Sequence, residues 1–238
     1  MTAMTTTTTE AAESRRLAGI TAIVSAPIAF ASAAVTLSGA DWDSKIFETP
    51  TRLLEYGAAA ANAARIGMVL DVIGYYALLV PVLLLLHRAM ARHRPDLAGI
   101  ATFAGATYII VGATGAGILS AVWPSALNDI GDVGADTAGI TASFDAITNG
   151  VVLGMWNIVG SAAIAVWLLI VGRMAWGTRR AFAGFTFVVA VAAAVDTIAT
   201  ALDVGSISSI ALQVYIYAAP LWAAWLGIDL LRGNEPIS

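Results

Sequence analysis

The stretch RIGMVLDVIGYYALLVPVLLLLHR occupies residues 65–88 of the chain. It is long and apolar enough to cross a membrane, since a helix needs about 20 mainly apolar residues to span roughly 30 Å of hydrocarbon. The only charge inside it is Asp71. An aspartate at the centre of a membrane helix costs roughly 2.5–3.5 kcal/mol. We therefore expect the rest of the chain to supply a polar surrounding for Asp71.

The composition agrees with a membrane location. Hydrophobic residues make up 59% of the 238 residues and charged residues only 12%, whereas soluble domains carry roughly 25% charged residues. The partner that this composition implies is a lipid bilayer. The chain has no cysteine, which excludes disulfides, iron–sulfur clusters and thiol catalysis.

Apolar runs of spanning length recur along the chain. Backbone groups in lipid must find their hydrogen-bond partners within the protein, so these runs are expected to be helices. The predicted fold class is all-α, a polytopic bundle of six transmembrane helices within a domain at 15–232. Residues 1–14, which are Thr-rich and acidic, are predicted to be a disordered cytoplasmic tail, and residues 233–238 a second cytoplasmic tail. The six runs are residues 17–38, 65–87, 98–122, 150–172, 182–203 and 209–231.

The basic residues predict the orientation. Arginine and lysine collect on the cytoplasmic side of membrane proteins, and one side of these six spans carries nine of them against three on the other. Both termini are therefore predicted to be cytoplasmic. The three on the outer side are Lys45, Arg52 and Arg65. The nine on the inner side are Arg15, Arg16, Arg88, Arg92, Arg94, Arg173, Arg179, Arg180 and Arg232.

Two long connections, 39–64 and 123–149, fall on the outer side. The first contains TPTRLLEYGAAAANAAR, whose alanines favour an outward extension of the second span or a surface helix. The second begins with Pro, Asp and Gly residues typical of a loop and is predicted to end in a short helix. Glycines in GATGAG (112–117) and GVVLG (150–154) predict close approach of helix backbones. Pro27, Pro81 and Pro220 are expected to kink their spans.

Residue counts exclude several membrane chemistries. The single lysine, Lys45, lies in an outer connection, so no lysine is available for a Schiff base within the bundle. The two histidines, His87 and His93, flank the inner ends of spans and cannot hold a haem between them. Zinc would lack nitrogen and sulfur ligands. We predict no cofactor and no metal, and no nucleic-acid partner because the arginines are accounted for by membrane flanks.

Polar side chains in the outer half of four spans suggest a site. Facing lipid individually would be costly for these two carboxylates and two amides, so they are expected to face inward and meet each other or water. Arg65 is the expected counter-charge, reaching a neighbouring helix. The sequence predicts a polar chamber that opens outward, with candidate ligand-binding residues Arg65, Asp71, Tyr75, Trp156, Asn157, Asp196, Gln213 and Tyr217. A buried network that only locks the helices together would use the same residues.

Three segments carry a resemblance to a known family. RRLAGITAI (15–23), ARIGMVLDVIGYYALLVPVLLLLHRAM (64–90) and RRAFAGFTFVVAVAAAVDTIATAL (179–202) resemble the bacterial family catalogued as domain of unknown function 4386. The most specific elements are the run ending at Asp71 and the late aspartate of the fifth span, Asp196. The resemblance covers most of 15–232 and implies six transmembrane helices in a bacterial plasma membrane. The family has no established activity.

Three functions remain open at this point. The first is a small-molecule-binding or transport-like module with an acidic and aromatic chamber for a cationic or amphipathic molecule. The second is an accessory or assembly subunit that docks on partner membrane subunits or on copies of itself. The third is a membrane enzyme that performs acid–base chemistry on an isoprenoid- or sterol-like lipid, with Asp71 and Asp196 as candidate catalytic residues.

Overall fold

A computed structural model describes residues 2–47, 49–235 and 237, and for residues 2–11 it describes the backbone only. Within these residues every regular element is helical. Short 3-10 or π-helical segments are labelled η. In chain order the elements are α1 (Thr2–Ser38), η1 (Ser44–Phe47), η2 (Pro50–Tyr56), α2 (Ala58–Asp71), η3 (Val72–Tyr76), η4 (Ala77–Leu79), α3 (Val80–Ala91), α4 (Pro95–Asp129), α5 (Thr137–Asn149), η5 (Gly150–Gly160), α6 (Ser161–Ala175), α7 (Arg180–Ala201) and α8 (Gly205–Leu231).

These elements form six rods that are long and apolar enough to cross a membrane, which confirms the prediction of six spans. The first is Ala12–Ser38, part of α1, which also includes residues that the sequence analysis assigned to an N-terminal tail. The others are Ala58–Ala91, Pro95–Asp129, Thr137–Ala175, Arg180–Ala201 and Gly205–Leu231. Six helices of this length and composition are typical of an integral membrane protein.

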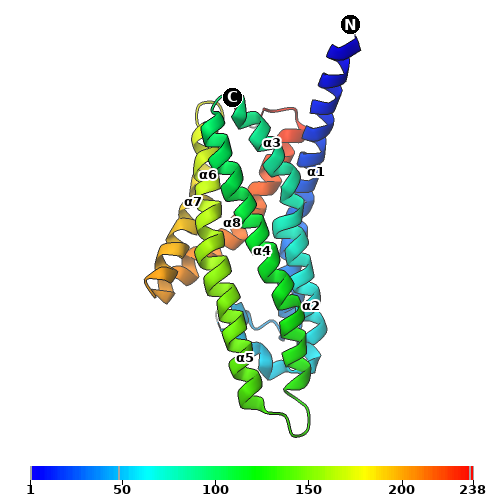
Figure 1. Cartoon of the computed structure of the whole chain (residues 1–238), viewed down its shortest axis with the longest axis vertical. Coiled ribbons are helices and arrows are strands. Elements are labelled where there is room, and N and C mark those ends of the chain that lie inside the picture. The colour runs from blue at the N-terminus through cyan, green and yellow to red at the C-terminus, as the bar shows by residue number, and fades with distance from the viewer. Residues whose placement is uncertain (1, 48, 236, 238) are drawn as a thin grey trace.

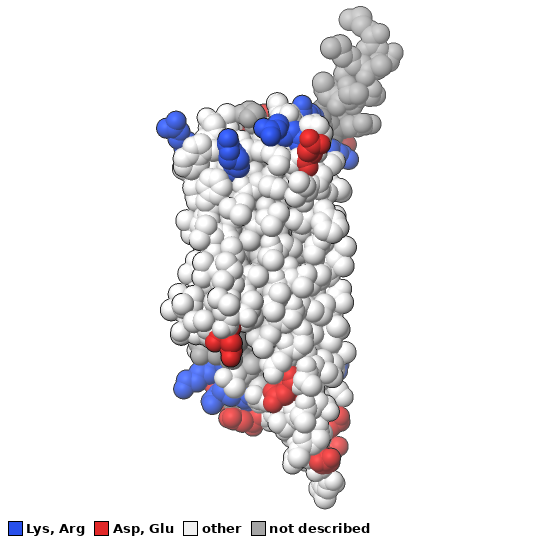
Figure 2. All heavy atoms as spheres, turned by 60° about the vertical axis from the view of Figure 1, so that its left-hand side comes forward, with Lys and Arg blue, Asp and Glu red and all other residues white. Residues whose placement is uncertain are grey.

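Charge separates along the bundle (Figure 2). Charged side chains gather at its two ends, and the band between them is nearly free of charge. Both chain termini lie at one end (Figure 1), where Arg15 pairs with Glu235 and Arg179 pairs with Asp229. We call this the basic end, and the end that carries the 39–57 and 130–136 connections the acidic end.

At the acidic end the helices run further than the apolar segments of the sequence. The α7–α8 turn stops well short of the α4–α5 turn in Figure 1, so α2, α4 and α5 continue past it. The prediction that the second span extends outward is confirmed, since α2 begins at Ala58. The prediction that 123–149 begins as a loop is wrong at its start, because α4 continues through Pro124 to Asp129. The short helix predicted after it is confirmed as α5.

The extension is held together by a second hydrophobic cluster beyond the main core. Trp123 explains why α4 continues: its ring stacks on Phe144 of α5 at 6.3 Å, and its Nε1 donates to the Thr148 hydroxyl at 3.0 Å. Burial of these side chains favours the extra turns of α4 even though Pro124 lacks a helix hydrogen bond. The buried members of this acidic-end cluster are Ala40, Ile46, Leu53, Leu54, Ala60, Ala61, Ala64, Met68, Leu119, Trp123, Leu127, Phe144 and Val151.

An ion pair fastens the 39–57 connection over this cluster. The Arg52 guanidinium lies 2.7 Å from the Asp43 carboxylate, which also accepts from the Tyr56 hydroxyl at 3.4 Å. The hydrogen bond from Arg52 holds the pKa of Asp43 below its ordinary value of 3.8. The contribution of this pair to stability is therefore complete above the ordinary pKa and is lost as the pH falls through the lowered one.

Packing of α1 against its neighbours depends on close backbone contact. α1 lies against α2 on one side and α8 on the other. A Cβ atom added at Gly227 of α8 would lie 2.6 Å from the Gly19 carbonyl oxygen, and one at Gly74 would lie 2.5 Å from the Ala29 nitrogen. These two glycines permit contacts that any side chain would prevent.

The close contacts do not lie where the sequence predicted them. In GATGAG, Gly112 and Gly115 make room for the rings of Tyr76 and Trp156 rather than for another backbone. In GVVLG, added Cβ atoms at Gly150 and Gly154 would meet nothing within 4 Å. The abundance of small residues therefore indicated tight packing correctly but did not identify the partners, because an aromatic ring can fill the same gap as a helix backbone.

Gly227→Ala should destabilise the bundle by about 1–3 kcal/mol, because the new methyl group meets backbone atoms of α1 that cannot move aside. Apparent Tm in detergent measures the effect. Gly184→Ala is the matched control, since open space surrounds that position and alanine favours the helix. Equal Tm values for the Gly227 and Gly184 variants would contradict the α1–α8 contact.

Arg52→Gln should loosen the 39–57 connection at neutral pH, and wild-type protein should show the same loosening in acid, as the pH falls through the lowered pKa of Asp43 and its carboxylate becomes protonated. Amide-exchange protection factors for residues 44–56 give the measurement. Asp132→Asn, a change in the exposed 130–136 connection, serves as control. Protection that stays constant in Arg52→Gln and at low pH would show that the ion pair does not hold this segment.

Candidate functional site

Three polar residues of the predicted site lie at one depth in the bundle. Asp71 is 17 residues before Arg88, Asn157 is 16 before Arg173, and Asp196 is 16 after Arg180. At 1.5 Å per residue each lies about 24 Å from the basic end, which is inside the roughly 30 Å hydrocarbon layer and near its far side. Each polar group therefore needs a partner from the protein or from a bound molecule.

Asp196 has its partners within the chain. Its side chain is fully buried in α7 and accepts hydrogen bonds from the Ser161 hydroxyl of α6 at 2.9 Å and the Ser208 hydroxyl of α8 at 2.8 Å. The Thr200 hydroxyl lies 2.8 Å from that of Ser208. One carboxyl group thus joins three helices, and none of the ion pairs found in the described part of the chain involves it.

Asp71 lacks such partners. It is the last residue of α2, and its Oδ2 is buried without a hydrogen bond. The nearest hydroxyl is that of Ser32 in α1, but this hydroxyl donates to the Gly67 carbonyl oxygen at 2.9 Å. Because a hydroxyl has one proton to donate, Ser32 serves either the Gly67 carbonyl or one oxygen of Asp71, and Oδ2 has no partner in the described residues. Asp71 therefore presents an unsatisfied acceptor inside the bundle.

Several tyrosines lie in the neighbourhood of this acceptor. The charge of Asp71 acts electrostatically on the hydroxyl groups of Tyr75, Tyr76 and Tyr108. The rings of Tyr76 and Tyr108 are 5.2 Å apart, and those of Tyr75 and Tyr76 are 6.2 Å apart. Tyr215 of α8 is buried beside Tyr108. We call Tyr75, Tyr76, Tyr108 and Tyr215 the tyrosine cluster.

A proline explains how the tyrosine cluster is tied to α8. Pro220 has no N–H group, so the carbonyl of Ile216, four residues earlier, loses its helical donor. The Tyr75 hydroxyl donates to that carbonyl oxygen at 3.1 Å. Neighbouring side chains commonly satisfy carbonyls that proline frees inside a membrane. Tyr75 therefore fixes the distance between η3 and α8 directly beside Asp71.

Both irregular segments of the spans lie at the depth of the site. η3 is a π-helical stretch that begins directly after Asp71 and is followed by the 3-10 turn η4, just before Pro81. η5 is also π-helical and contains Trp156 and buried Asn157. Trp156 Nε1 donates to the Gly112 carbonyl oxygen of α4 at 3.2 Å. π-helical turns are rare and frequently mark functional sites.

Three of the predicted residues do not face the interior. Arg65 is exposed and, within the part of the chain that the structure describes, forms no ion pair. Its expected role as counter-charge is therefore wrong, because Asp196 is satisfied by hydroxyls instead. Gln213 is exposed on α8. Tyr217 is 54% exposed and stacks on Phe30 of α1 at 6.5 Å.

The described contacts also divide the predicted chamber. Asp71 lies with Ser32 and the tyrosine cluster, whereas Asp196 lies with Ser161 and Ser208; no hydrogen bond joins the two carboxyl groups in the described residues. The sequence analysis did not predict the roles of Ser32, Ser208, Tyr108 and Tyr215. A usable signal was present, since five of the six tyrosines fall within the spans.

No family model, curated protein or solved structure matches this chain. The resemblance to the family of unknown function thus stays a prediction.

Asp196→Asn should lower stability by about 1–3 kcal/mol, because an amide offers one acceptor oxygen where two hydroxyls now donate. The same change at Asp71 should alter stability by less than about 0.5 kcal/mol, since no donor loses its acceptor there. Apparent Tm in detergent, with tryptophan fluorescence as readout, compares the two isosteric changes. Losses of equal size would contradict the difference between the two carboxyl groups.

Proposed function

We propose that this protein binds a lipophilic cation at Asp71. The ligand class is a protonated amine carried on a compact apolar body. The site comprises the Asp71 carboxyl group and the tyrosine cluster. We further propose that the protein belongs to the family of unknown function that it resembles, and that it is a multi-pass protein of a bacterial plasma membrane with both termini in the cytoplasm. The arrangement of nine basic residues against three supports that orientation.

One observation carries the proposal: the buried Oδ2 of Asp71 has no hydrogen-bond partner in the described residues. A buried polar atom without a partner costs about 1–3 kcal/mol, and native proteins leave few of them. A protonated amine would donate a charge-assisted hydrogen bond to this oxygen. It would also supply the positive charge that Arg65, exposed at a distance from the bundle interior, does not.

The surroundings of Asp71 suit the rest of such a ligand. Tyrosine rings attract a cation through their faces, with about 2 kcal/mol or more where water is excluded. They also provide apolar area for the body of the molecule. The alternative carboxyl group, Asp196, is a poorer candidate, because Ser161 and Ser208 already occupy both of its oxygens. We therefore assign Asp196 to the structure of the bundle and Asp71 to binding.

Binding of 1-adamantylamine, which is positively charged at pH 7, should be measurable by tryptophan fluorescence or thermal stabilisation of the purified protein. 1-Adamantanol has the same body without the charge and should bind at least about tenfold more weakly, a difference of about 1.4 kcal/mol. Asp71→Asn should reduce amine affinity by at least the same factor, because the neutral amide cannot pair with the ammonium group.

Asp203→Asn is the matched control: it removes a carboxylate that is exposed after α7 and should leave the affinity unchanged. Two results would defeat the proposal. One is equal binding of the amine and the alcohol. The other is undiminished amine binding by a folded Asp71→Asn variant.

A further inference from the structure

A second region of interest lies at the basic end between α7 and α8, away from Asp71. A hollow of about 310 Å³ opens there. Its lining combines two cations, one carboxylate and two aromatic rings, which is unusual for a surface otherwise facing hydrocarbon. The lining residues are Arg179, Arg180, Ala181, Phe182, Trp225 and Asp229.

The charges in this hollow do not cancel. Arg179 uses its Nη2 to pair with the carboxylate of Asp229, which is buried in α8. Among the described residues, the buried Nη1 of Arg179 has no hydrogen-bond partner, while the guanidinium carbon lies 4.5 Å from the centre of the Phe182 ring. Arg180 beside it is exposed. Two arginines and one aspartate give the hollow a net charge of +1. The Nη1 group of Arg179 adds a hydrogen-bond donor that the described residues leave unpaired.

The start of α7 adds to this positive potential. α7 begins at Arg180, has no side-chain cap, and carries no acidic residue in its first turn. The first N–H groups of a helix lack partners within it, and the helix dipole places partial positive charge there. Such N–H groups and arginine side chains are groups that bind phosphate in other proteins.

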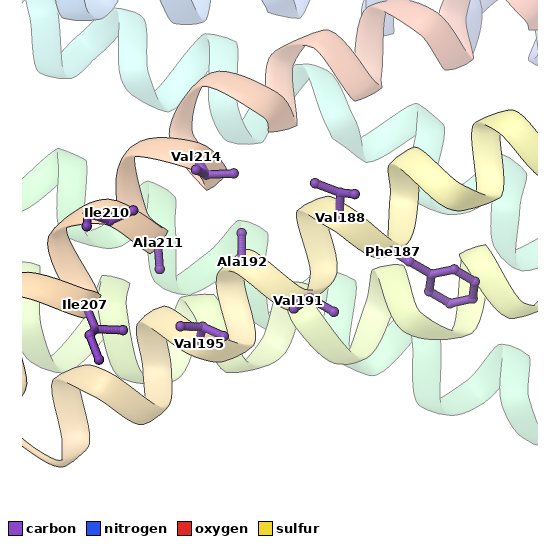
Figure 3. Close-up of a pocket in the computed structure, with 9 residues that line it drawn as sticks. All are labelled: Phe187, Val188, Val191, Ala192, Val195, Ile207, Ile210, Ala211 and Val214. Atoms are coloured by element: carbon purple, nitrogen blue, oxygen red, sulfur yellow. The ribbon is translucent and has the colours of Figure 1, made fainter.

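A groove without polar lining lies further along the same pair of helices (Figure 3). Its volume is about 530 Å³, and Val191 on its wall is 54% exposed. Side chains of α7 and α8 point toward one another across it. The lining residues are Phe187, Val188, Val191, Ala192, Val195, Ile207, Ile210, Ala211 and Val214.

The hollow and the groove lie on one seam between α7 and α8. Residues seven apart lie on one face of a helix, and Ala181 of the hollow is followed at that spacing by Val188 and Val195 of the groove. On α8, Trp225 and Ala211 are related by two such steps. Between the two regions the rings of Phe185 and Trp225 stack at 5.8 Å.

We infer that this seam binds one anionic phospholipid, with its phosphate at Arg179, Arg180 and the first turn of α7 and an acyl chain in the α7–α8 groove. A headgroup with a net charge of −1 matches the net charge of the hollow. A zwitterionic lipid is disfavoured, because its own ammonium group would lie beside Arg180. Trp225 occupies the level between phosphate and hydrocarbon where tryptophan is enriched in membrane proteins.

The end of the groove nearest the hollow fits a lipid of one leaflet, whereas Val195, about 22 Å along α7 from Arg180, lies beyond the middle of the bilayer. The groove begins seven residues after Arg180 at Phe187, which is about 10 Å along α7. One leaflet contributes about half of the roughly 30 Å hydrocarbon layer. An acyl chain anchored at the hollow therefore reaches the groove before the middle of the bilayer. Basic pockets between transmembrane helices are known to hold anionic headgroups.

The test compares lipid retention by native mass spectrometry after the protein is purified in detergent with dioleoyl phosphatidylglycerol or dioleoyl phosphatidylcholine. The wild-type protein should retain the phosphatidylglycerol preferentially. Arg180→Gln should reduce that retention about fivefold, the effect of removing one basic residue near an anionic headgroup. Arg173→Gln, which removes an exposed arginine at the same end but outside the hollow, should not.

Two further measurements separate the parts of the proposal. Val191→Trp fills the groove and should reduce retention of the diacyl lipid, while leaving thermal stabilisation by glycerol 1-phosphate unchanged. If glycerol 1-phosphate stabilised the protein as much as the lipid does, the acyl-chain assignment would be overturned in favour of a soluble phosphate. Three results would overturn the lipid site. The first is equal retention of both lipids, and the second is an equal effect of the two arginine variants. The third is a dimer that Val191→Trp abolishes while lipid retention stays the same.

Discussion

Hydrocarbon offers no hydrogen-bond partner, so every polar group within the membrane must find one in the protein. This constraint accounts for the internal contacts of the bundle. Ser161 and Ser208 satisfy Asp196, and Tyr75 satisfies the carbonyl that Pro220 leaves free. Within the spans that the structure describes, two buried side-chain polar atoms lack both a hydrogen bond and an ion pair, Trp167 Nε1 and Asp71 Oδ2, and only the second belongs to an ionisable group. Because each polar group in the membrane needs a partner, a bound ligand is the partner that we propose for Asp71.

The irregular backbone around Asp71 fits that role. A regular second span would place residues 72–80 in one continuous α-helix. Instead the π-helical η3 and the 3-10 turn η4 precede Pro81, which lacks the N–H group that a regular helix would use at that point. Gly74 brings this segment against Ala29 of α1. α1 and η3 are therefore in contact beside Asp71, while Tyr75 reaches α8. The irregular turn η3, which follows Asp71 directly in the chain, thus carries Tyr75 and Tyr76.

Much of the architecture could be predicted from the sequence. Apolar length identified the six spans, and the alternation of spans placed both termini at one end. The level of Asp71 and Asp196 followed from counting residues. The partners of these residues did not follow, because they depend on rotation about the helix axes. Ser208 satisfies Asp196 only because the α7–α8 turn folds back over it, and no spacing rule within one helix contains that information.

Side-chain direction was the other limit. Gln213 carries the polar amide expected of an inward-facing residue, yet it is exposed on α8. Its neighbours Ile210 and Val214 line the lipid-facing groove. α8 is apolar on most of its circumference, so hydropathy could not tell which face packs inward. Arg65 was likewise assigned to a buried partner because charges attract, although an exposed arginine at the acidic end retains its hydration and has no need of one.

The most direct measurement uses the absence of cysteine from the chain. Single cysteines would replace Ser32, which lies beside Asp71, or Ser161, which lies beside Asp196, so that both carboxyl groups stay in place. Each variant would be treated with N-ethylmaleimide, which reacts with thiols that water can reach, in the presence and absence of 1-adamantylamine. A binding site at Asp71 predicts that the thiol at position 32 reacts and is protected by the amine, while the thiol at position 161 stays unreactive. Rapid reaction at position 161 together with an inert thiol at position 32 would contradict the account.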